Sequence, residues 1–159
     1  MIHHDASDLL VERLSTEQIA TVFPLMRAAD PGLSLAAWRR FARRSTTPTR
    51  RPAPYGVLVA RRPAQRYPSG AVYYARHRDM HGTSVLTAEH FVALDLLYPE
   101  AVISALIAGL EPVAMLLGCC SIRSIVKNTA MPLIETLQLQ GHRAEAVTFI
   151  KSGPQRAVA

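Results

Sequence analysis

The sequence has little cysteine and little lysine, and each shortage makes some kinds of protein or site less plausible. Its two cysteines are neighbours, Cys119 and Cys120. Adjacent side chains on a strand point to opposite faces, so a disulfide between them would be strained. We therefore expect reduced thiols in a cytoplasmic protein. Zinc sites need spaced pairs of ligands, so the cysteines predict no metal centre.

No uninterrupted apolar run indicates a membrane span or a secretory signal. The start of the chain has acid and histidine where a signal would have a basic and then an apolar region. The most apolar stretch runs from Leu94 to Cys120. It is interrupted by an acid and a proline, Glu111 and Pro112, near the middle of its C-terminal half. An acid there costs about 2.5–3.5 kcal/mol in a bilayer. Apolar residues recur at helical spacing, which predicts a core helix over 101–117, with a kink or a break near Gly109 to Pro112.

Acidic residues are outnumbered, and the net charge is +6. Lys127 and Lys151 are the only lysines, so the basic residues are almost all arginine. Many of them lie between Arg39 and Arg66, in "WRRFARRSTTPTRRPAPYGVLVARRPAQR". This cluster predicts an exposed surface for an anionic partner. The alternative is that the chain uses arginine at ordinary solvated surface positions, where it binds no partner. Because no nucleic-acid motif accompanies the cluster, an acidic protein is favoured over nucleic acid.

Hydrophobic periodicity predicts one mixed α/β domain over residues 9–151, between a flexible start (1–8) and a frayed tail (152–159). Ser15 and Gln18 form a capping-box signature for the first helix. The expected order is β-α-α-β-β-β-α-β-α-β, in a sheet of six or seven strands. Strands are predicted at 8–14, 55–62, 70–78, 84–97, 119–126 and 145–151, and helices at 16–29, 35–44, 101–117 and 128–140.

This order resembles that of the GNAT acyltransferase superfamily. The residues that carry the resemblance are "VFPLMR" followed by "LSLAAW", the hairpin glycine Gly70, "LLGCCSIRSI" and "QLQGHR". The resemblance implies a mixed, mostly antiparallel sheet flanked by helices. It also implies transfer of an acyl group from acyl-CoA to an amine acceptor. The alternative function is a non-catalytic GNAT-like binding module whose arginine-rich surface meets an acidic partner. A homodimer is compatible with either function.

Two motifs depart from the family pattern. In the family, an R/Q-x-x-G-x-G/A loop closes backbone N–H groups on the coenzyme A pyrophosphate. The corresponding stretch here is "YPEAVIS", Tyr98 to Ser104, which has no glycine and places a carboxylate at Glu100. The family's general-acid tyrosine is replaced by Leu137. These departures predict weak binding of acyl-CoA.

The resemblance also gives candidate site residues. Glu89 is the candidate general base, because a carboxylate beside an apolar site can remove a proton from an ammonium group. A solvated strand-edge glutamate is the plainer interpretation. His90 and Asp95 are rival candidates, although alternation along a strand puts His90 on the opposite face from Glu89. By position alone, the cofactor-binding candidates are Leu94, Asp95, Leu96, Tyr98, Ala101 and Val102.

Two further patterns carry less weight. His77 and His81 have the spacing of paired metal ligands on a helix, and Asp79 lies between them. Their context predicts a strand end and a turn, which does not bring the two imidazoles together. On the third strand, Tyr73 and Tyr74 send one ring to each face, and we expect one of the two to be core.

Overall fold

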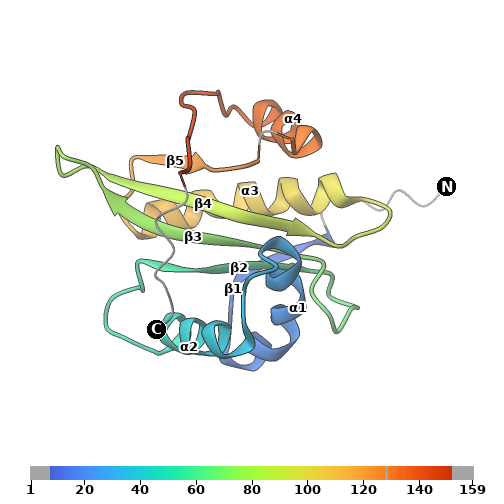
Figure 1. The fold of residues 1–159 in the computed structure, drawn as a ribbon. Helices are drawn as coiled ribbons and strands as arrows, with labels where there is room; N and C mark the ends of the chain where they lie inside the picture. The colour runs from blue at the N-terminus through green and yellow to red at the C-terminus, as the bar shows by residue number, and fades with distance from the viewer. Residues whose placement is uncertain (1–7, 128, 152–159) are drawn as a thin grey trace, which may run out of the picture.

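The computed structural model describes residues 8–127 and 129–151, so the predictions for 1–7, Asn128 and 152–159 lie outside it. The helices and strands follow the expected order as far as the last described helix (Figure 1). In chain order the elements are β1 (Leu10–Arg13), the 3-10 helix η2 (Thr16–Gln18), α1 (Ile19–Ala29), α2 (Leu35–Thr46), β2 (Tyr55–Arg61), β3 (Gly70–Arg78), β4 (Ser84–Ala93), α3 (Pro99–Leu116), β5 (Ser121–Ser124) and α4 (Met131–Leu139).

The strands form one mixed sheet in the order β1-β2-β3-β4-β5. Neighbours from β1 to β4 are antiparallel, whereas β4 and β5 are parallel. The mixed, mostly antiparallel sheet of the prediction is therefore confirmed. Within the described residues it has five strands, because the predicted last strand, 145–151, is not in strand conformation. Val147, Phe149 and Ile150 are instead exposed.

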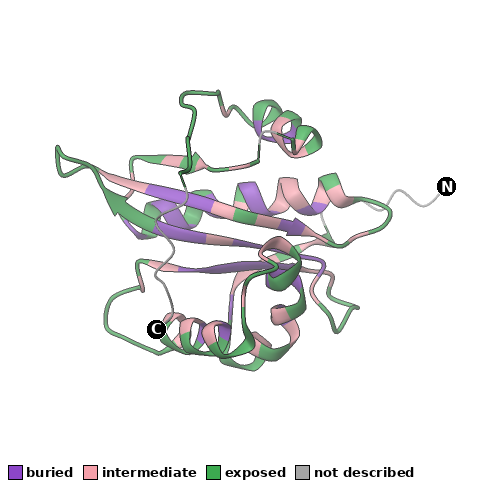
Figure 2. Cartoon of the chain, viewed as in Figure 1, coloured by how far each residue is buried: buried purple, intermediate pink, exposed green. Residues whose placement is uncertain are grey.

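Helices cover both faces of the sheet. Figure 1 shows α1 and α2 on one side and α3 on the other, with α4 beside α3. Each face has its own core, one under α3 and one under α1 and α2. Figure 2 shows that the buried residues concentrate in the central strands and on the side of α3 that faces them. Tyr74 is fully buried on the α3 side, so one ring of the tyrosine pair is core, as expected.

α3 is the long apolar helix that the sequence predicts. Its length and composition would allow it to cross a membrane, but its buried side chains pack on the sheet: Val102, Leu106, Ile107, Leu110, Val113 and Ala114. The helix continues through Pro112 without a break. Close approach to the sheet depends on Gly109, because a Cβ there would lie 2.6 Å from Cγ1 of Val11.

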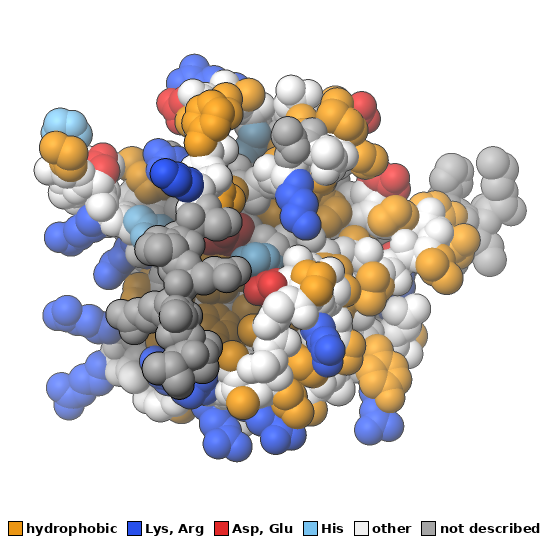
Figure 3. Space-filling model, in the orientation of Figure 1, with side chains coloured by type: hydrophobic (Ala, Val, Ile, Leu, Met, Phe, Trp, Pro, Cys, Tyr) orange, Lys and Arg blue, Asp and Glu red, His pale blue; other side chains and the backbone are white. Residues whose placement is uncertain are grey.

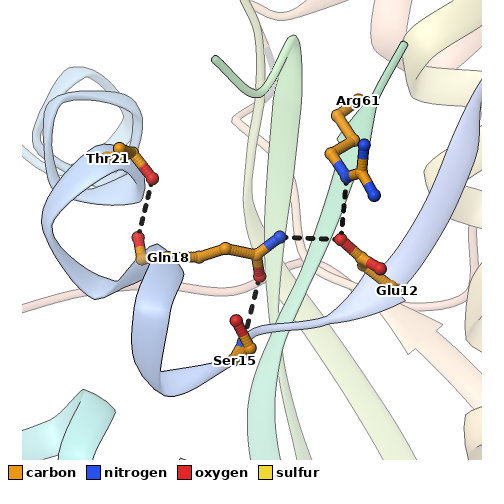
Figure 4. A network of polar contacts seen from close by, with 5 residues as sticks. All are labelled: Glu12, Ser15, Gln18, Thr21 and Arg61. Carbon is orange, nitrogen blue, oxygen red and sulfur yellow. Dashed lines mark hydrogen bonds and ion pairs between the residues drawn. The ribbon is translucent and has the colours of Figure 1, made fainter. Parts of the chain in front are cut away.

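A polar network fixes the entry into the first helix (Figure 4). The Ser15 N–H donates to Oε1 of Gln18 at 3.0 Å, as the capping-box signature predicts. The amide of Gln18 in turn donates to Glu12 at 2.7 Å. Nε of Arg61 donates to the same carboxylate oxygen at 2.9 Å, and this holds the pKa of Glu12 below its usual value. The network joins β1, β2 and η2 beside the opening of α1.

Candidate functional site

The strands β4 and β5 diverge halfway along β4. They pair at four positions, from Val85 opposite Ser121 to Ala88 opposite Ser124. One further hydrogen bond, from the N–H of Ile125 to the carbonyl of Ala88 at 2.8 Å, closes the pairing. β4 then continues for five residues to Ala93, and no described strand pairs with it on that side. The residues next to this divergence form the candidate site.

A β-bulge lies at the divergence. Tyr73 faces Glu89 and Ala71 faces Val92, so β4 has one more residue than β3 between these pairs. His90 absorbs the extra residue with a φ of 57°, and it is the only non-glycine residue with positive φ in the described chain. This conformation is uncommon for a histidine. Bulges that re-aim side chains are frequent next to active sites.

The bulge brings Glu89 and His90 together. Their closest side-chain atoms, Oε2 of Glu89 and Nε2 of His90, are 4.0 Å apart. The expectation that His90 lies on the opposite face is therefore wrong, because simple alternation stops at a bulge. The ring of Tyr73 lies 6.3 Å from that of His90. Three groups that can exchange protons thus share one patch, and about a third of each acidic and imidazole side chain is exposed (34% and 39%).

The pKa of Tyr73 depends on the charge of this patch. Burial raises the pKa of its phenol, and the negative charge of Glu89 raises that pKa further. Tyr73 is therefore a neutral O–H group at neutral pH, available as a hydrogen-bond donor. Glu89 supplies the charge, and its side chain and that of His90 both reach solvent.

Asp95 lies elsewhere and has a different role. Its Oδ1 accepts the N–H groups of Leu97 and Tyr98 at 3.0 and 2.9 Å, and its Oδ2 accepts Nη2 of Arg62 at 3.0 Å. The bond from Tyr98 and the pair with Arg62 hold the pKa of Asp95 below its usual value. The carboxylate of Asp95 thus accepts hydrogen bonds from the two N–H groups that lead into α3.

The other cofactor-binding candidates differ in accessibility. Val102 is fully buried, and a Cβ on Gly70 would meet its Cγ1 at 2.4 Å, so its side chain belongs to the core. The N–H of Leu94 donates to the carbonyl of Ser69 at 2.8 Å and cannot serve a ligand arm. Leu96 is 98% exposed. Tyr98 is exposed and Ala101 half-buried, at the start of α3. Their role in binding a cofactor stays a prediction.

His77 and His81 lie at the end of β3 and in the turn that follows it. Oδ1 of Asp79 accepts the N–H groups of His81 and Thr83 at 2.9 and 2.8 Å, which closes the β3–β4 turn. Within residues 8–127 and 129–151, no group of three or more histidine, cysteine or acidic side chains is placed to hold a metal ion.

The arginine cluster is exposed, as predicted. On α2, Arg39, Arg40, Arg43 and Arg44 all face solvent, as do Arg50, Arg51 and Arg66. Figure 3 shows basic side chains along the lower and left edges of the displayed face. Arg61 and Arg62 differ from the rest, because each is half-buried and paired with an acid, Glu12 or Asp95.

Comparisons with known proteins identify the fold. No protein-family model matches the sequence, and no curated protein does. Solved structures match nearly the whole chain. An acetyltransferase of Trypanosoma brucei is 20% identical, with a TM-score of 0.68, and the match covers 91% of this chain and 99% of that one. Aminoglycoside N-acetyltransferase AAC(6')-Iy in complex with CoA is 14% identical, with a TM-score of 0.72, over 91% and 94% of the two chains.

The described chain has the GNAT acetyltransferase fold. The GNAT-like resemblance of the sequence is thereby confirmed at the level of fold. A third match, glucosamine-6-phosphate N-acetyltransferase of Arabidopsis thaliana, is 10% identical with a TM-score of 0.69, over 91% and 97% of the two chains. The second and third of these proteins are named for different acceptors, an aminoglycoside and glucosamine 6-phosphate, so the fold does not identify the acceptor.

Sequence reasoning missed the partners of Glu89. The bulge at His90 is a property of two paired strands and has no signature in either strand alone. The usable signal was the polar pair Glu89–His90 inside an apolar strand. Phe41 and Tyr55, which lie near Tyr73, were also missed, because they come from α2 and β2.

Proposed function

We propose that the protein is a GNAT-type N-acyltransferase that moves an acyl group from acyl-CoA to an amine. The observation that carries the proposal is the patch of Glu89, His90 and Tyr73 on the bulge of β4, beside the divergence from β5. The GNAT fold supports the class of reaction. Solved structures of this fold include complexes with CoA and with a bisubstrate analogue.

In this proposal Glu89 is the general base. An acceptor amine is a cation at neutral pH and has no free lone pair until it loses a proton. The Glu89 carboxylate removes that proton, and the amine can then attack the thioester carbonyl that the donor supplies. As the C–N bond forms, the C–S bond of the thioester breaks, and the coenzyme A thiolate leaves with the proton that the nitrogen releases on becoming an amide. His90 lies 4.0 Å from Glu89 and can pass the proton to solvent. The neutral O–H of Tyr73 is a potential hydrogen-bond donor in the same patch.

Acyl-CoA binding is weak in this proposal. Asp95 already binds the N–H groups of Leu97 and Tyr98. Its negative charge, and that of exposed Glu100, oppose the phosphates. The residues that would hold a pyrophosphate in the family pattern therefore fit it poorly.

The experiment is an acetyl-transfer assay with acetyl-CoA and a panel of primary amines, read by mass spectrometry. Glu89→Gln should lower kcat/KM by about 10²–10⁴-fold, the usual contribution of a general base. Glu111→Gln is the matched control, since Glu111 is an exposed glutamate on α3. Equal rates for wild type and Glu89→Gln would contradict the assignment of the base.

A non-catalytic binding module is the second candidate function. Two observations favour it. Asp95 already accepts hydrogen bonds from the N–H groups before α3. The arginines of α2 are exposed and form no ion pair with any described residue. The partner in that case is an acidic protein. Absence of acetyl transfer to every amine tested, together with salt-sensitive binding to an acidic polymer, would favour this second function.

A further inference from the structure

A line of aromatic rings leads to Glu89. The ring centroids of Phe41 and Tyr55 are 5.6 Å apart, and those of Phe41 and Tyr73 are also 5.6 Å apart. The ring of Tyr73 then lies 6.3 Å from that of His90. Four separate elements, α2, β2, β3 and β4, supply these rings. Such convergence is a tertiary feature that no single segment would produce.

The rings border the core without being sealed in it. Phe41, Tyr55 and Tyr73 are each half-buried, and His90 is exposed. Behind them, Trp38 is 1% exposed and lies 6.0 Å from Phe41, so it anchors the group from the core side. Flat, partly exposed rings of this kind offer apolar contact, and their faces attract cations.

Charge is unevenly distributed around this group. Glu89 is the acid next to it: its negative charge acts on Tyr73, and its Oε2 lies 4.0 Å from Nε2 of His90. The helix that supplies Phe41 also carries exposed Arg40 and Arg44. The whole chain has a net charge of +6. One positive charge on a ligand is therefore matched by Glu89, and further positive charges meet repulsion.

We propose that Phe41, Tyr55, Tyr73 and Glu89 form the acceptor subsite for a monoamine whose single ammonium group is carried on a flat, apolar body. The ammonium group binds the Glu89 carboxylate, and the body lies on the rings. This inference rests on the proposed function, because it names the acceptor class of that same site. It sets the chain apart from a neighbour that is named for aminoglycosides, which carry several amines.

Ligand binding without turnover tests the inference directly. Two-dimensional NMR titration with 2-phenylethylamine should shift the amide signals of residues 73 and 88–91 saturably. Glu89→Gln should weaken this binding about tenfold, the loss of one charge-assisted contact of about 1.4 kcal/mol. Tyr73→Ala should weaken it about two- to fivefold through lost ring contact. Glu17→Gln, at an exposed glutamate of η2, is the control and should bind as the wild type does.

Ligand variants complete the test. 2-Phenylethanol keeps the ring but not the charge, so it should bind more weakly and be indifferent to Glu89→Gln. Kanamycin should bind no better than 2-phenylethylamine. No saturable binding of 2-phenylethylamine, or binding untouched by both Glu89→Gln and Tyr73→Ala in folded variants, would overturn the subsite. Tighter binding of kanamycin would also overturn it.

The two proposals can fail separately. Glu89-dependent binding of 2-phenylethylamine without any acetyl transfer leaves the subsite standing and removes the acyltransferase function. Acetyl transfer to kanamycin, with no binding of 2-phenylethylamine, supports the acyltransferase function and removes the subsite. Circular dichroism of each variant shows whether the fold is retained.

Discussion

At the scale of single residues, Asp95 combines two effects on one carboxylate. It accepts two backbone N–H groups and one guanidinium nitrogen of Arg62. These contacts favour the ionised form, which is why the pKa of Asp95 lies below its usual value. The same charge stabilises the start of α3 and opposes any phosphate that approaches it.

Replacing Asp95 should make stability depend differently on pH. A carboxyl whose pKa is lowered by folding stabilises the native state above its usual pKa, 3.8, and loses that contribution as pH falls through the lower folded value. At pH 7 the wild type should therefore exceed Asp95→Asn in free energy of unfolding, by about 1–2 kcal/mol. The difference should shrink towards pH 2. Urea unfolding at both pH values measures it.

The control for this comparison is Asp8→Asn, at an exposed aspartate near the start of the described chain. That variant should track the wild type at both pH values. A gap between wild type and Asp95→Asn that stays constant from pH 7 to pH 2 would show that the charge of Asp95 is not responsible.

The residues of the site were only partly predictable. Glu89 followed from a resemblance, since a carboxylate at that point of the fourth strand matches the family pattern. Its neighbour His90 was placed on the wrong face, because alternation assumes unbroken pairing and the extra residue breaks it. Val102 is a cofactor-binding candidate by position alone, whereas its side chain packs against Gly70 in the core. The side on which a side chain lies depends on contacts between elements, and periodicity within one element does not predict those contacts.

At the scale of elements, helix α3 packs on β3 through Gly70. A Cβ at that position would lie 2.4 Å from Cγ1 of Val102 and 2.8 Å from the carbonyl oxygen of Val92. The side chain could shift, but the backbone oxygen has little freedom. Gly70→Ala should therefore lower the free energy of unfolding by about 1–3 kcal/mol, as overpacking usually does.

Thermal unfolding followed by circular dichroism measures this effect. Gly32→Ala is the control, since a Cβ there would meet only a side-chain oxygen of Asp30 at 3.4 Å, an ordinary contact. Gly70→Ala with the Tm of the wild type would mean that α3 does not pack on the sheet as closely as described.

The elements themselves were largely predictable, with one exception. Helices and strands up to α4 follow periodicity, capping residues and turn residues, all of which are local signals. The segment 145–151 has the β-branched and aromatic residues of a strand but is not one. A strand exists only when a neighbour supplies hydrogen bonds, and β5 itself is only four residues long.

At the scale of the whole molecule, positive charge dominates the surface. The net charge is +6, and Arg39, Arg40 and Arg43 are exposed on one helix. A variant with Arg39→Gln, Arg40→Gln and Arg43→Gln should elute from heparin at clearly lower salt than the wild type, because screening weakens exposed charge pairs. The control removes the same charge elsewhere, at Arg78, Arg123 and Arg143.

If the two triple variants elute together, net charge alone explains the retention and the α2 surface has no special role. Earlier elution of the α2 variant supports an anionic partner at that helix. Both variants keep the buried residues of the two cores, so their Tm values should match that of the wild type.

At this scale, the proposed function predicts that the chain binds acyl-CoA weakly, because the negative charge of Asp95 repels the phosphates. Calorimetric titration of acetyl-CoA into the wild type and into Asp95→Asn tests this claim most directly. We predict a wild-type Kd on the order of 0.1 mM or weaker. In Asp95→Asn the Kd should be about fivefold lower, from about 1 kcal/mol of relieved repulsion. Submicromolar binding by the wild type that Asp95→Asn leaves unchanged would contradict the account.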